Sequence, residues 1–497
     1  MEYQNIASTR EVDEELGYNW GMGKYYITTT APYVNSDPHI GFALEIIQAD
    51  AVARYHQLIG DEVFFNTGTD EHGKKIYEKA LEEKRDVQDY VDEYAAKFRD
   101  LKTLLGLSEL LHFSRTTDES HITAAQEMWK RVDSAGYIRR GVYQAKYCVG
   151  CELEKQESEL EDGVCPLHPN KQIELINEEN YFFCFSKLQK DLLALYENYP
   201  DFVVPAHRQK EIKNFVSGGL SDFSISRLKE KMPWGVPVPG DSSQVMYVWF
   251  DALTYYISAL GWPESSVNFD QYWGSKDHPT AVQVAGKDNL RQQTSMWQAM
   301  LIAAGLPTSR QIMIHGFITS NGMKISKSLG NTVDPVEYVN KYGVDALRYY
   351  LLGKIDPFED SDFTHEKFEE VYKADLQNGL GNLVSRVAAM ATGTAGQSNT
   401  GSVVSEKVAK ALSEYRFDEA TKDIWDRIKK ADQLISERKV WELKGEEKTI
   451  IITELITTIV GIATDLLPLL PTTAQKILDN YTSPSISKMT PIFPRLT

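Results

Sequence analysis

The stretch Lys24-Tyr25-Tyr26-Ile27-Thr28-Thr29-Thr30, followed by Ser36-Asp37-Pro38-His39-Ile40-Gly41, decides the fold. Its first part is rich in β-branched and aromatic residues, which is typical of a buried strand. In the second part, Asp37 can cap free backbone N–H groups and Pro38 suits the first helical position. We therefore expect a helix that begins here, continues to about Leu58 and ends at Gly60.

A second strand is predicted from Val63 to Thr67, directly after that helix. Strand, helix and strand in this order form a βαβ unit, so the default architecture is a parallel nucleotide-binding sheet. From 137 to 240, short strands, a cysteine cluster and Pro/Gly-rich turns indicate an inserted domain. After residue 365, apolar residues recur only at the three- and four-residue spacing of helices. The expected segments are an N-terminal extension (1–23), the first half of the sheet domain (24–136), the insertion (137–240), the second half (241–315), a loop region (316–365) and a helical domain (366–497).

Composition is that of an ordinary globular protein. The 497 residues are 42% hydrophobic, 25% charged and 11% aromatic, and the length suits about three domains. The formal net charge of −18 argues against a protein that coats nucleic acid non-specifically. It does not exclude an RNA-binding enzyme, because recognition depends on local patches rather than on the total charge.

The sequence favours a cytoplasmic protein without a membrane segment. Glu2, Glu11 and Asp13 near the N-terminus do not fit the basic and then apolar pattern of a signal peptide. The most apolar stretch, 450–470, is interrupted by Glu454 and Asp465, and the run between these acids is shorter than the roughly 20 residues that span a bilayer.

Pro38-His39-Ile40-Gly41 stands where the first strand passes into the first helix. A helix N-terminus at the carboxyl edge of a parallel sheet suits phosphate, because its N–H groups are free and its dipole is positive there. His39 can donate to a phosphate oxygen, and Gly41 leaves room for a nucleotide. Taken alone, the tetrapeptide is equally consistent with a cap followed by a glycine needed for packing.

A second element runs from Ser320 to Asn331 and contains Lys324-Ile325-Ser326-Lys327-Ser328. Asn321-Gly322 indicates a tight turn after a strand. Two lysines on a serine- and glycine-rich loop can close over a triphosphate and stabilise the negative charge that develops in the transition state. Taken alone, the segment can also be an ordinary surface loop.

A metal site is predicted at Cys148-X2-Cys151-X13-Cys165-X2-His168. Two close pairs of nitrogen and sulfur ligands suit a closed, tetrahedral, structural Zn²⁺ site in a reducing compartment. Chance clustering of buried cysteines is the alternative. Cys184 is expected in the core, although it can also replace His168 as a ligand.

Together and in this order, the two nucleotide elements resemble the signature motifs of class I aminoacyl-tRNA synthetases. The cysteine cluster, Pro233-Trp234-Gly235 and Tyr247-Val248-Trp249-Phe250-Asp251-Ala252-Leu253 resemble the methionyl-tRNA synthetase family, from about Lys24 to Arg495. Three positions depart from the family pattern: Phe42 replaces a histidine, Ile325 replaces a methionine, and Gln293 replaces a pocket histidine.

The resemblance implies a Rossmann-like α/β sheet with an inserted zinc-knuckle connective domain and an all-α C-terminal anticodon-binding bundle. It implies an ATP-dependent methionine–tRNA ligase acting on L-methionine, ATP with Mg²⁺ and tRNA(Met). The implied catalytic residues are His39, Lys324 and Lys327. The implied ATP contacts are Pro38, Gly41, Phe42, Asp288, Ser326 and Ser328. The implied methionine pocket is Ala31, Tyr33, Asp70, Trp249, Ala252, Leu253, Tyr256 and Gln293.

The resemblance also implies that Asn382, Arg386 and Trp441 contact the anticodon, and that Arg227 approaches the substrate carboxylate or phosphates. Two other functions stay open. One is an amino-acid-adenylating enzyme with a non-tRNA acceptor, suggested by Phe42, Gln292 and Gln293. The other is a catalytically silent tRNA-binding protein. A monomer is expected, since we find no added dimerisation module.

Overall fold

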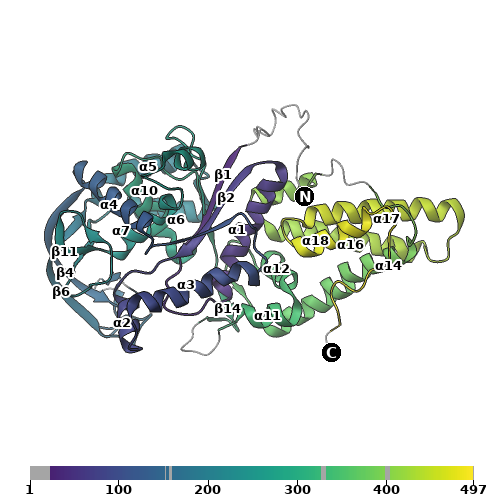
Figure 1. Cartoon of the computed structure of the whole chain (residues 1–497), viewed down its shortest axis with the longest axis horizontal. Helices are drawn as coiled ribbons and strands as arrows, with labels where there is room; N and C mark the ends of the chain where they lie inside the picture. Colours follow the sequence, from purple (N-terminus) through teal and green to yellow (C-terminus); the bar gives the residue numbers. More distant parts are fainter. Residues whose placement is uncertain (1–22, 152, 156–158, 326–331, 398–402, 496–497) are drawn as a thin grey trace.

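The computed structural model describes residues 23–151, 153–155, 159–325, 332–397 and 403–495. Figure 1 shows an elongated molecule with an α/β part at one end and a helical part at the other. Helices α1 (Ile40–Ile59) and α12 (Val344–Gly353) lie where the two parts meet.

Six parallel strands form the central sheet in the order β3-β2-β1-β12-β13-β7. Their bounds are β1 (Lys24–Thr29), β2 (Glu62–Thr69), β3 (Leu111–Arg115), β7 (Val203–Val204), β12 (Val282–Gly286) and β13 (Gln311–His315). Ile27 of β1 is opposite Phe65 on one side and Val282 on the other. The predicted parallel sheet is therefore confirmed, and its carboxyl edge is where a ligand site is expected.

Helix α1 begins two residues later than its capping signals suggest. His39, not Asp37, is the N-cap: its Nδ1 accepts the N–H of Gly41 at 3.1 Å. Asp37 is instead exposed and pairs with Lys97 at 3.0 Å, which explains why its carboxylate does not cap the helix. The predicted end is confirmed, since Gly60 has a φ of 102°.

The segment 137–240 contributes a second, antiparallel sheet with the order β5-β4-β6-β8. Its strands are β4 (Ile138–Cys148), β5 (Leu153–Lys155), β6 (Ile173–Phe183) and β8 (Phe223–Ser224). A further sheet, β10-β11-β9, consists of β9 (Ser226–Leu228), β10 (Pro237–Val238) and β11 (Asp241–Met246). Strand β7 belongs to the same segment of chain but pairs with β13 in the central sheet.

Helices cover the sheets and lead to the helical part. In the α/β part they are α2 (Lys74–Glu82), α3 (Val87–Leu104), α4 (Glu119–Ser134), α5 (Gln189–Asn198), α6 (Ala206–Ser217), α7 (Val248–Ala252), α8 (Tyr255–Ser258), α9 (Ser266–Asn268) and α10 (Trp297–Ala303). Short one-turn or π-helical segments are η2 (Phe185–Leu188), η3 (Phe269–Trp273), η4 (Lys287–Asn289) and η5 (Gln292–Met296). A small sheet of β14 (Ile318–Ser320), β15 (Met323–Lys324) and β16 (Ser361–Asp362) precedes the helical part.

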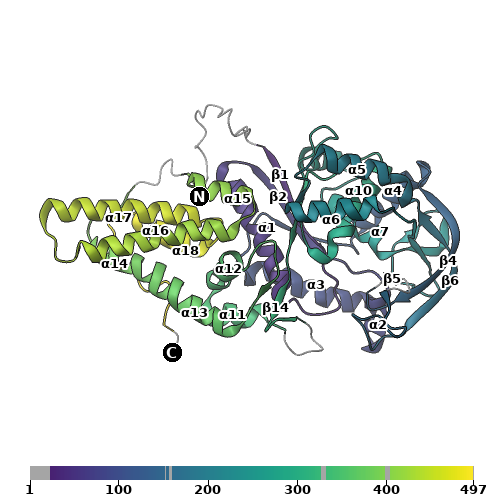
Figure 2. The ribbon, with the colours of Figure 1, turned by 180° about the vertical axis from the view of Figure 1, so that it is seen from behind.

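The C-terminal part is helical, as predicted, and Figure 2 shows α16, α17 and α18 lying lengthwise. The elements are α11 (Pro335–Tyr342), α13 (His365–Val371), η7 (Tyr372–Gly381), α14 (Asn382–Met390), α15 (Glu406–Ser413), α16 (Phe417–Glu437), α17 (Gly445–Leu466) and α18 (Pro471–Tyr481). By length and composition α17 is apolar enough to cross a membrane, although its acids led us to expect otherwise. However, 61% of that window is buried within the protein, so packing explains its composition.

Candidate active site and metal centre

The ends of β1 and β2 bring the first site residues together. Tyr33 and Asp70 form an isolated parallel bridge beyond the two strands, and the N–H of Asp70 donates to the Pro32 carbonyl at 2.9 Å. The Asp70 side chain is only 4% exposed. A buried carboxylate at the carboxyl edge of the sheet is suited to a cationic group of a ligand.

A cleft of about 400 Å³ opens at this edge. All eight residues of the predicted methionine pocket line it: Ala31, Tyr33, Asp70, Trp249, Ala252, Leu253, Tyr256 and Gln293. They come from the loops after β1 and β2, from α7 and its end, from α8 and from η5. Segments far apart in the chain therefore form one wall that is mostly apolar and aromatic, with one carboxylate.

The other side of the cleft is formed by the start of α1 and the segment after β12. His39, Gly41, Phe42 and Asp288 line it. Because His39 Nδ1 accepts from Gly41, the proton of the neutral ring is on Nε2, where it can be donated to a ligand. A Cβ on Gly41 would lie 3.0 Å from the His39 ring, so glycine leaves room for this cap. Phe42 packs edge-on against Phe98.

The other residues predicted for the nucleotide site have different positions relative to the cleft. Pro38 is half-buried before α1 and is not among the residues that line the cleft. Lys324 is in β15, and Ile325 lines the cleft. Ser326, Lys327 and Ser328 lie outside the described residues.

Glu45 and His315 also line the cleft, and sequence reasoning missed both. His315 Nε2 is 2.9 Å from Glu45 Oε2, while Glu45 Oε1 accepts from the backbone N–H and the hydroxyl of Thr30. Burial lowers the pKa of His315, but the Glu45 carboxylate and the Gly316 carbonyl outweigh burial and raise it. The sequence feature that could have identified His315 is its position at the carboxyl end of an apolar strand.

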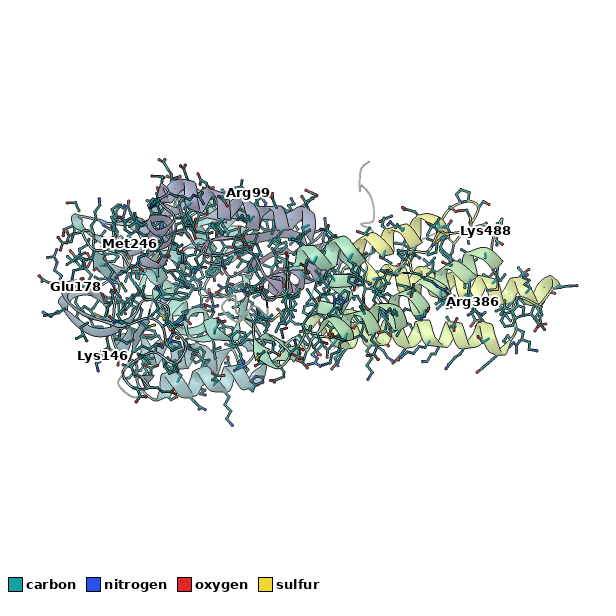
Figure 3. All side chains as sticks on the ribbon, turned by 90° about the horizontal axis from the view of Figure 1, so that it is seen from below. Arg99, Lys146, Glu178, Met246, Arg386 and Lys488 are labelled. Carbon is teal, nitrogen blue, oxygen red and sulfur yellow. The ribbon has the colours of Figure 1, made fainter. Side chains whose placement is uncertain are left out.

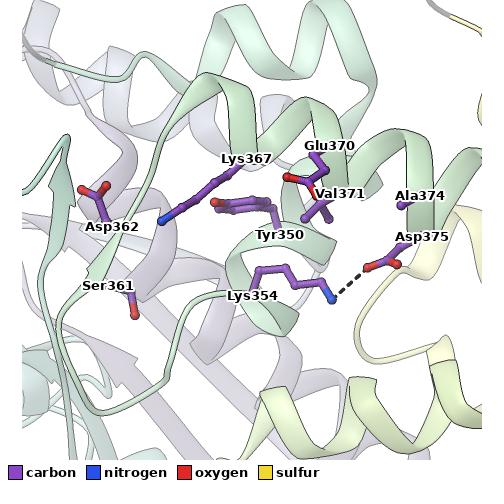
Figure 4. A pocket seen from close by; sticks show the side chains of 9 residues that line it. All are labelled: Tyr350, Lys354, Ser361, Asp362, Lys367, Glu370, Val371, Ala374 and Asp375. Carbon is purple, nitrogen blue, oxygen red and sulfur yellow. Dashed lines mark ion pairs between the residues drawn. The ribbon is translucent and has the colours of Figure 1, made fainter.

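A second cavity, of about 470 Å³, lies beside α12, β16, α13 and η7 (Figure 4). Its lining consists of Tyr350, Lys354, Ser361, Asp362, Lys367, Glu370, Val371, Ala374 and Asp375. Lys354 Nζ pairs with Asp375 Oδ2 at 2.8 Å. The other charged side chains of the lining are Asp362, Lys367 and Glu370, which carry both signs of charge. None of the described candidate residues lines this cavity, so the cleft at the sheet edge is the candidate active site.

The predicted metal ligands come together at the end of β4. The ligand atoms of Cys148, Cys151, Cys165 and His168 all lie within 4.8 Å of one another. The separations of Cys151 Sγ from Cys165 Sγ and from His168 Nδ1 are 3.5 and 3.2 Å, which suits a tetrahedron of Zn²⁺ ligands at about 2.0–2.3 Å from the ion.

Two further observations fit a cation in this cluster. Burial and neighbouring sulfurs raise the pKa of Cys151 to about 12, so a thiolate there needs a positive charge beside it. A Cβ on Gly150 would lie only 2.4 Å from the His168 ring, so glycine lets the histidine enter. Cys184, the alternative ligand, is buried in the core outside the cluster.

The residues predicted to bind the anticodon lie in the helical part. Asn382 and Arg386 are one turn apart on α14, and Arg386 forms an ion pair with Asp432. Figure 3 shows Arg386 on the helical part and Glu178 near the opposite end. Trp441 follows α16 and is 51% exposed, which is unusual for a large aromatic side chain.

Arg227 is not among the residues that line the cleft. Its guanidinium lies 4.5 Å from the ring centre of Tyr247, and Nη1 donates to the Ser224 hydroxyl at 2.8 Å. The predicted approach to a carboxylate or phosphate therefore remains a prediction.

Comparison with known proteins agrees with this geometry. The model of the family of class I tRNA synthetases (M) matches residues 25–388. The chain is 41% identical to a methionine–tRNA ligase of Nostoc over 85% of this chain and 82% of that protein. It is 37% identical to the methionine–tRNA ligase of Thermotoga maritima over 91% of this chain and 74% of that protein. The chain belongs to the methionyl-tRNA synthetase family.

Solved structures of this family have the same fold. The Mycobacterium tuberculosis methionyl-tRNA synthetase in complex with methionyl-adenylate matches with a TM-score of 0.87 and 32% identity, covering 95% of this chain and all of that one. Its apo form matches with a TM-score of 0.80 and 30% identity, covering 96% of this chain and 99% of that one. Methionyl-tRNA synthetases are ATP-dependent ligases, so the cleft lies in an enzyme of the expected class.

Proposed function

We propose that this chain activates L-methionine with ATP and transfers the methionyl group from the adenylate to the 3′ terminal adenosine of tRNA(Met), for initiation and elongation of translation. The observation that carries the proposal is the single cleft in which the eight predicted methionine contacts face His39, Gly41 and Asp288. An amino acid and a nucleotide can meet there at the carboxyl edge of the sheet.

In the methionine half, Asp70 holds the ammonium group by a charge-assisted hydrogen bond, while Trp249 and its apolar neighbours surround the thioether chain. In the nucleotide half, Asp288 binds a ribose hydroxyl. Phosphates lie against the start of α1, where backbone N–H groups and His39 Nε2 donate to them. His315, held by Glu45 and the Gly316 carbonyl, completes the polar lining of the same cleft.

The substrate carboxylate attacks the α-phosphate in line, and pyrophosphate leaves. The chain accelerates this step mainly by holding the reactants close together and by stabilising negative charge, to which Lys324 and Lys327 contribute. Mg²⁺ bound with ATP neutralises part of the phosphate charge. The tRNA ribose hydroxyl then attacks the methionyl carbonyl, and AMP leaves.

The cysteine cluster is proposed to bind structural Zn²⁺, because four nitrogen and sulfur ligands leave no open position for catalysis. Asn382, Arg386 and Trp441 are proposed to read the anticodon, since an exposed aromatic ring can stack on an unpaired base. Translation is cytoplasmic, so the same location is proposed for this protein. A monomer is expected, and light scattering of the purified chain tests it.

ATP–pyrophosphate exchange with each of the twenty amino acids, followed by charging of tRNA(Met), tests the function. We expect exchange that depends on methionine, and charging of tRNA(Met) but not of an elongator tRNA with another anticodon. Exchange without charging would favour the alternative, an adenylating enzyme with a non-tRNA acceptor. Absence of methionine-dependent exchange would contradict the proposed activity.

A further inference from the structure

A row of buried polar side chains begins behind the cleft and ends at the methionine pocket. Its members are Ser309, Gln298, Gln283, Gln293 and Tyr256, and none is more than 3% exposed. Gln283 is on β12, Gln293 is in η5, Gln298 is in α10, Tyr256 is in α8, and Ser309 precedes β13. Only Gln293 and Tyr256 line the cleft.

The backbone N–H of Ser309 fixes which atoms donate and which accept along the row, because an N–H group can only donate. It donates to Gln298 Oε1 at 3.0 Å, so the amide nitrogen of Gln298 must be the atom that faces the Ser309 hydroxyl, 3.1 Å away. This hydroxyl therefore accepts from Gln298 and donates onward to Gln283 Oε1 at 2.5 Å. The reverse orientation of Gln283 would leave the buried hydroxyl proton without this acceptor.

The next two bonds follow from the orientation of Gln283. Its Nε2 donates to Gln293 Oε1 at 3.1 Å, which leaves Gln293 Nε2 to donate to the Tyr256 hydroxyl oxygen at 2.5 Å. Within the described part of the chain, Gln293 is the hydrogen-bond partner of this hydroxyl. Since the oxygen accepts from Gln293, the phenolic proton is available to an acceptor in the cleft. Burial also raises the pKa of Tyr256, so this proton is retained.

We propose that Ser309, Gln283 and Gln293 form a relay of fixed direction that makes the Tyr256 hydroxyl a hydrogen-bond donor toward the thioether sulfur of the bound amino acid. This inference rests on the proposed methionine-activating function. A thioether sulfur is a weak acceptor, whereas a methylene group at the same position accepts nothing. The relay therefore favours methionine over norleucine, which has a methylene group in place of sulfur. Ser309 and Gln283 are positioning residues, because neither lines the cleft.

Two variants break the relay at different places. In Ser309→Ala, Gln283 loses its donor, so both glutamine amides can reverse and present Gln293 Oε1 to the Tyr256 hydroxyl. In Gln293→Glu, which has nearly the same shape, the carboxylate accepts the phenolic proton directly. Ser295→Ala is the matched control, because Ser295 is equally buried but its hydroxyl donates to the Arg291 carbonyl, outside the relay.

The measurement is kcat/KM for methionine and for norleucine in ATP–pyrophosphate exchange, with thermal unfolding recorded for each variant. We expect the methionine-to-norleucine ratio to fall about two- to fivefold in both relay variants, as for loss of one weak hydrogen bond. The ratio in Ser295→Ala and the KM for ATP in Ser309→Ala should be unchanged.

An unchanged ratio in both relay variants, or an equal loss for both amino acids, would overturn the relay while leaving methionine activation intact. If Ser309→Ala does not fold, Gln293→Glu gives the same ratio test by itself. Failure of the unaltered chain to exchange with methionine refutes the proposed function instead, so the two failures are distinguishable.

Discussion

Asp50 and Arg348 form an ion pair with 2.7 Å between Oδ2 and Nη1, and neither side chain is exposed to solvent. Asp50 is in α1, whose first turn borders the cleft, and Arg348 is in α12. Arg348 also donates to the carbonyl groups of Pro468 and Leu469, between α17 and α18. A single guanidinium therefore connects the sheet domain to the helical part.

Arg348→Met should lower the free energy of unfolding by about 2–4 kcal/mol, because buried Asp50 keeps Arg54 but loses this second partner, and two carbonyl groups lose their donor. Urea unfolding followed by circular dichroism measures the change. Arg438→Met is the control: its ion pair with Glu447 is more than half exposed, so a loss of no more than about 1 kcal/mol is expected. Equal losses in the two variants would contradict the importance of the buried pair.

Asp251 should contribute stability that depends on pH. Burial would raise its pKa, but His72 and His121, at 2.7 and 2.8 Å, outweigh burial and lower the pKa from 3.8 to about 2. A lowered pKa stabilises the fold above about pH 4, and this stabilisation is lost as pH falls through about 2.

The test compares urea unfolding of the unaltered chain and of Asp251→Asn at pH 5 and pH 3. The stability advantage of the unaltered chain should shrink by about 1 kcal/mol between these values. If the advantage is the same at both pH values, the assigned pKa is wrong.

The cysteine cluster should bind one Zn²⁺ per chain. Elemental analysis of the purified protein should find the metal, and Cys165→Ala should lose it because three ligands remain. Cys184→Ala is the matched control, since Cys184 is also buried but lies outside the cluster. Loss of zinc in the control but not in Cys165→Ala would show that the ligands were assigned wrongly.

Asp70→Asn should lower kcat/KM for methionine by about 10- to 100-fold, because a charge-assisted hydrogen bond to the ammonium becomes a neutral one. Exchange kinetics at varied methionine and ATP give both constants. Asp288→Asn serves as the reciprocal control, with the larger effect expected on ATP. A main effect of Asp70→Asn on the KM for ATP would exclude the assigned role.

Trp441→Ala should retain methionine-dependent exchange and lose most charging of tRNA(Met), since stacking on a base contributes about 1–3 kcal/mol. Ile450→Ala tests whether loss of any exposed apolar side chain of the helical part has this effect, because Ile450 is 61% exposed and lies in α17. Normal charging by Trp441→Ala would refute the anticodon assignment.

Much of the fold could be predicted from local signals. The β-branched residues of β1 and the glycine after α1 were sufficient to predict a βαβ unit. The spacing from Cys148 to His168 predicted a metal-ligand cluster, and the fold brings these residues together. The start of α1 was predicted wrongly, because Asp37 carries a strong capping signal but pairs with Lys97 from another helix. Competition of this kind depends on tertiary contacts that propensity does not contain.

The site residues that the sequence did not predict were missed for one physical reason, which is that their roles depend on tertiary contacts. Glu45 looks like any acid on a helix, and its role appears only when β13 brings His315 within 2.9 Å of it. The relay behind Tyr256 likewise depends on β12 and the loop before β13 lying side by side. Gln293 was noticed as a departure from the family pattern, but its partners were not predictable from sequence spacing.

The strand order has a consequence for synthesis on the ribosome. Strand β1 pairs with β12, so one edge of β1 stays open until Val282 and the residues after it have emerged. At about 5–20 residues per second, this takes on the order of ten seconds to a minute. During that time a strand rich in aromatic and β-branched residues is exposed to other chains, so nascent forms of this protein should depend on chaperones more than the finished one does.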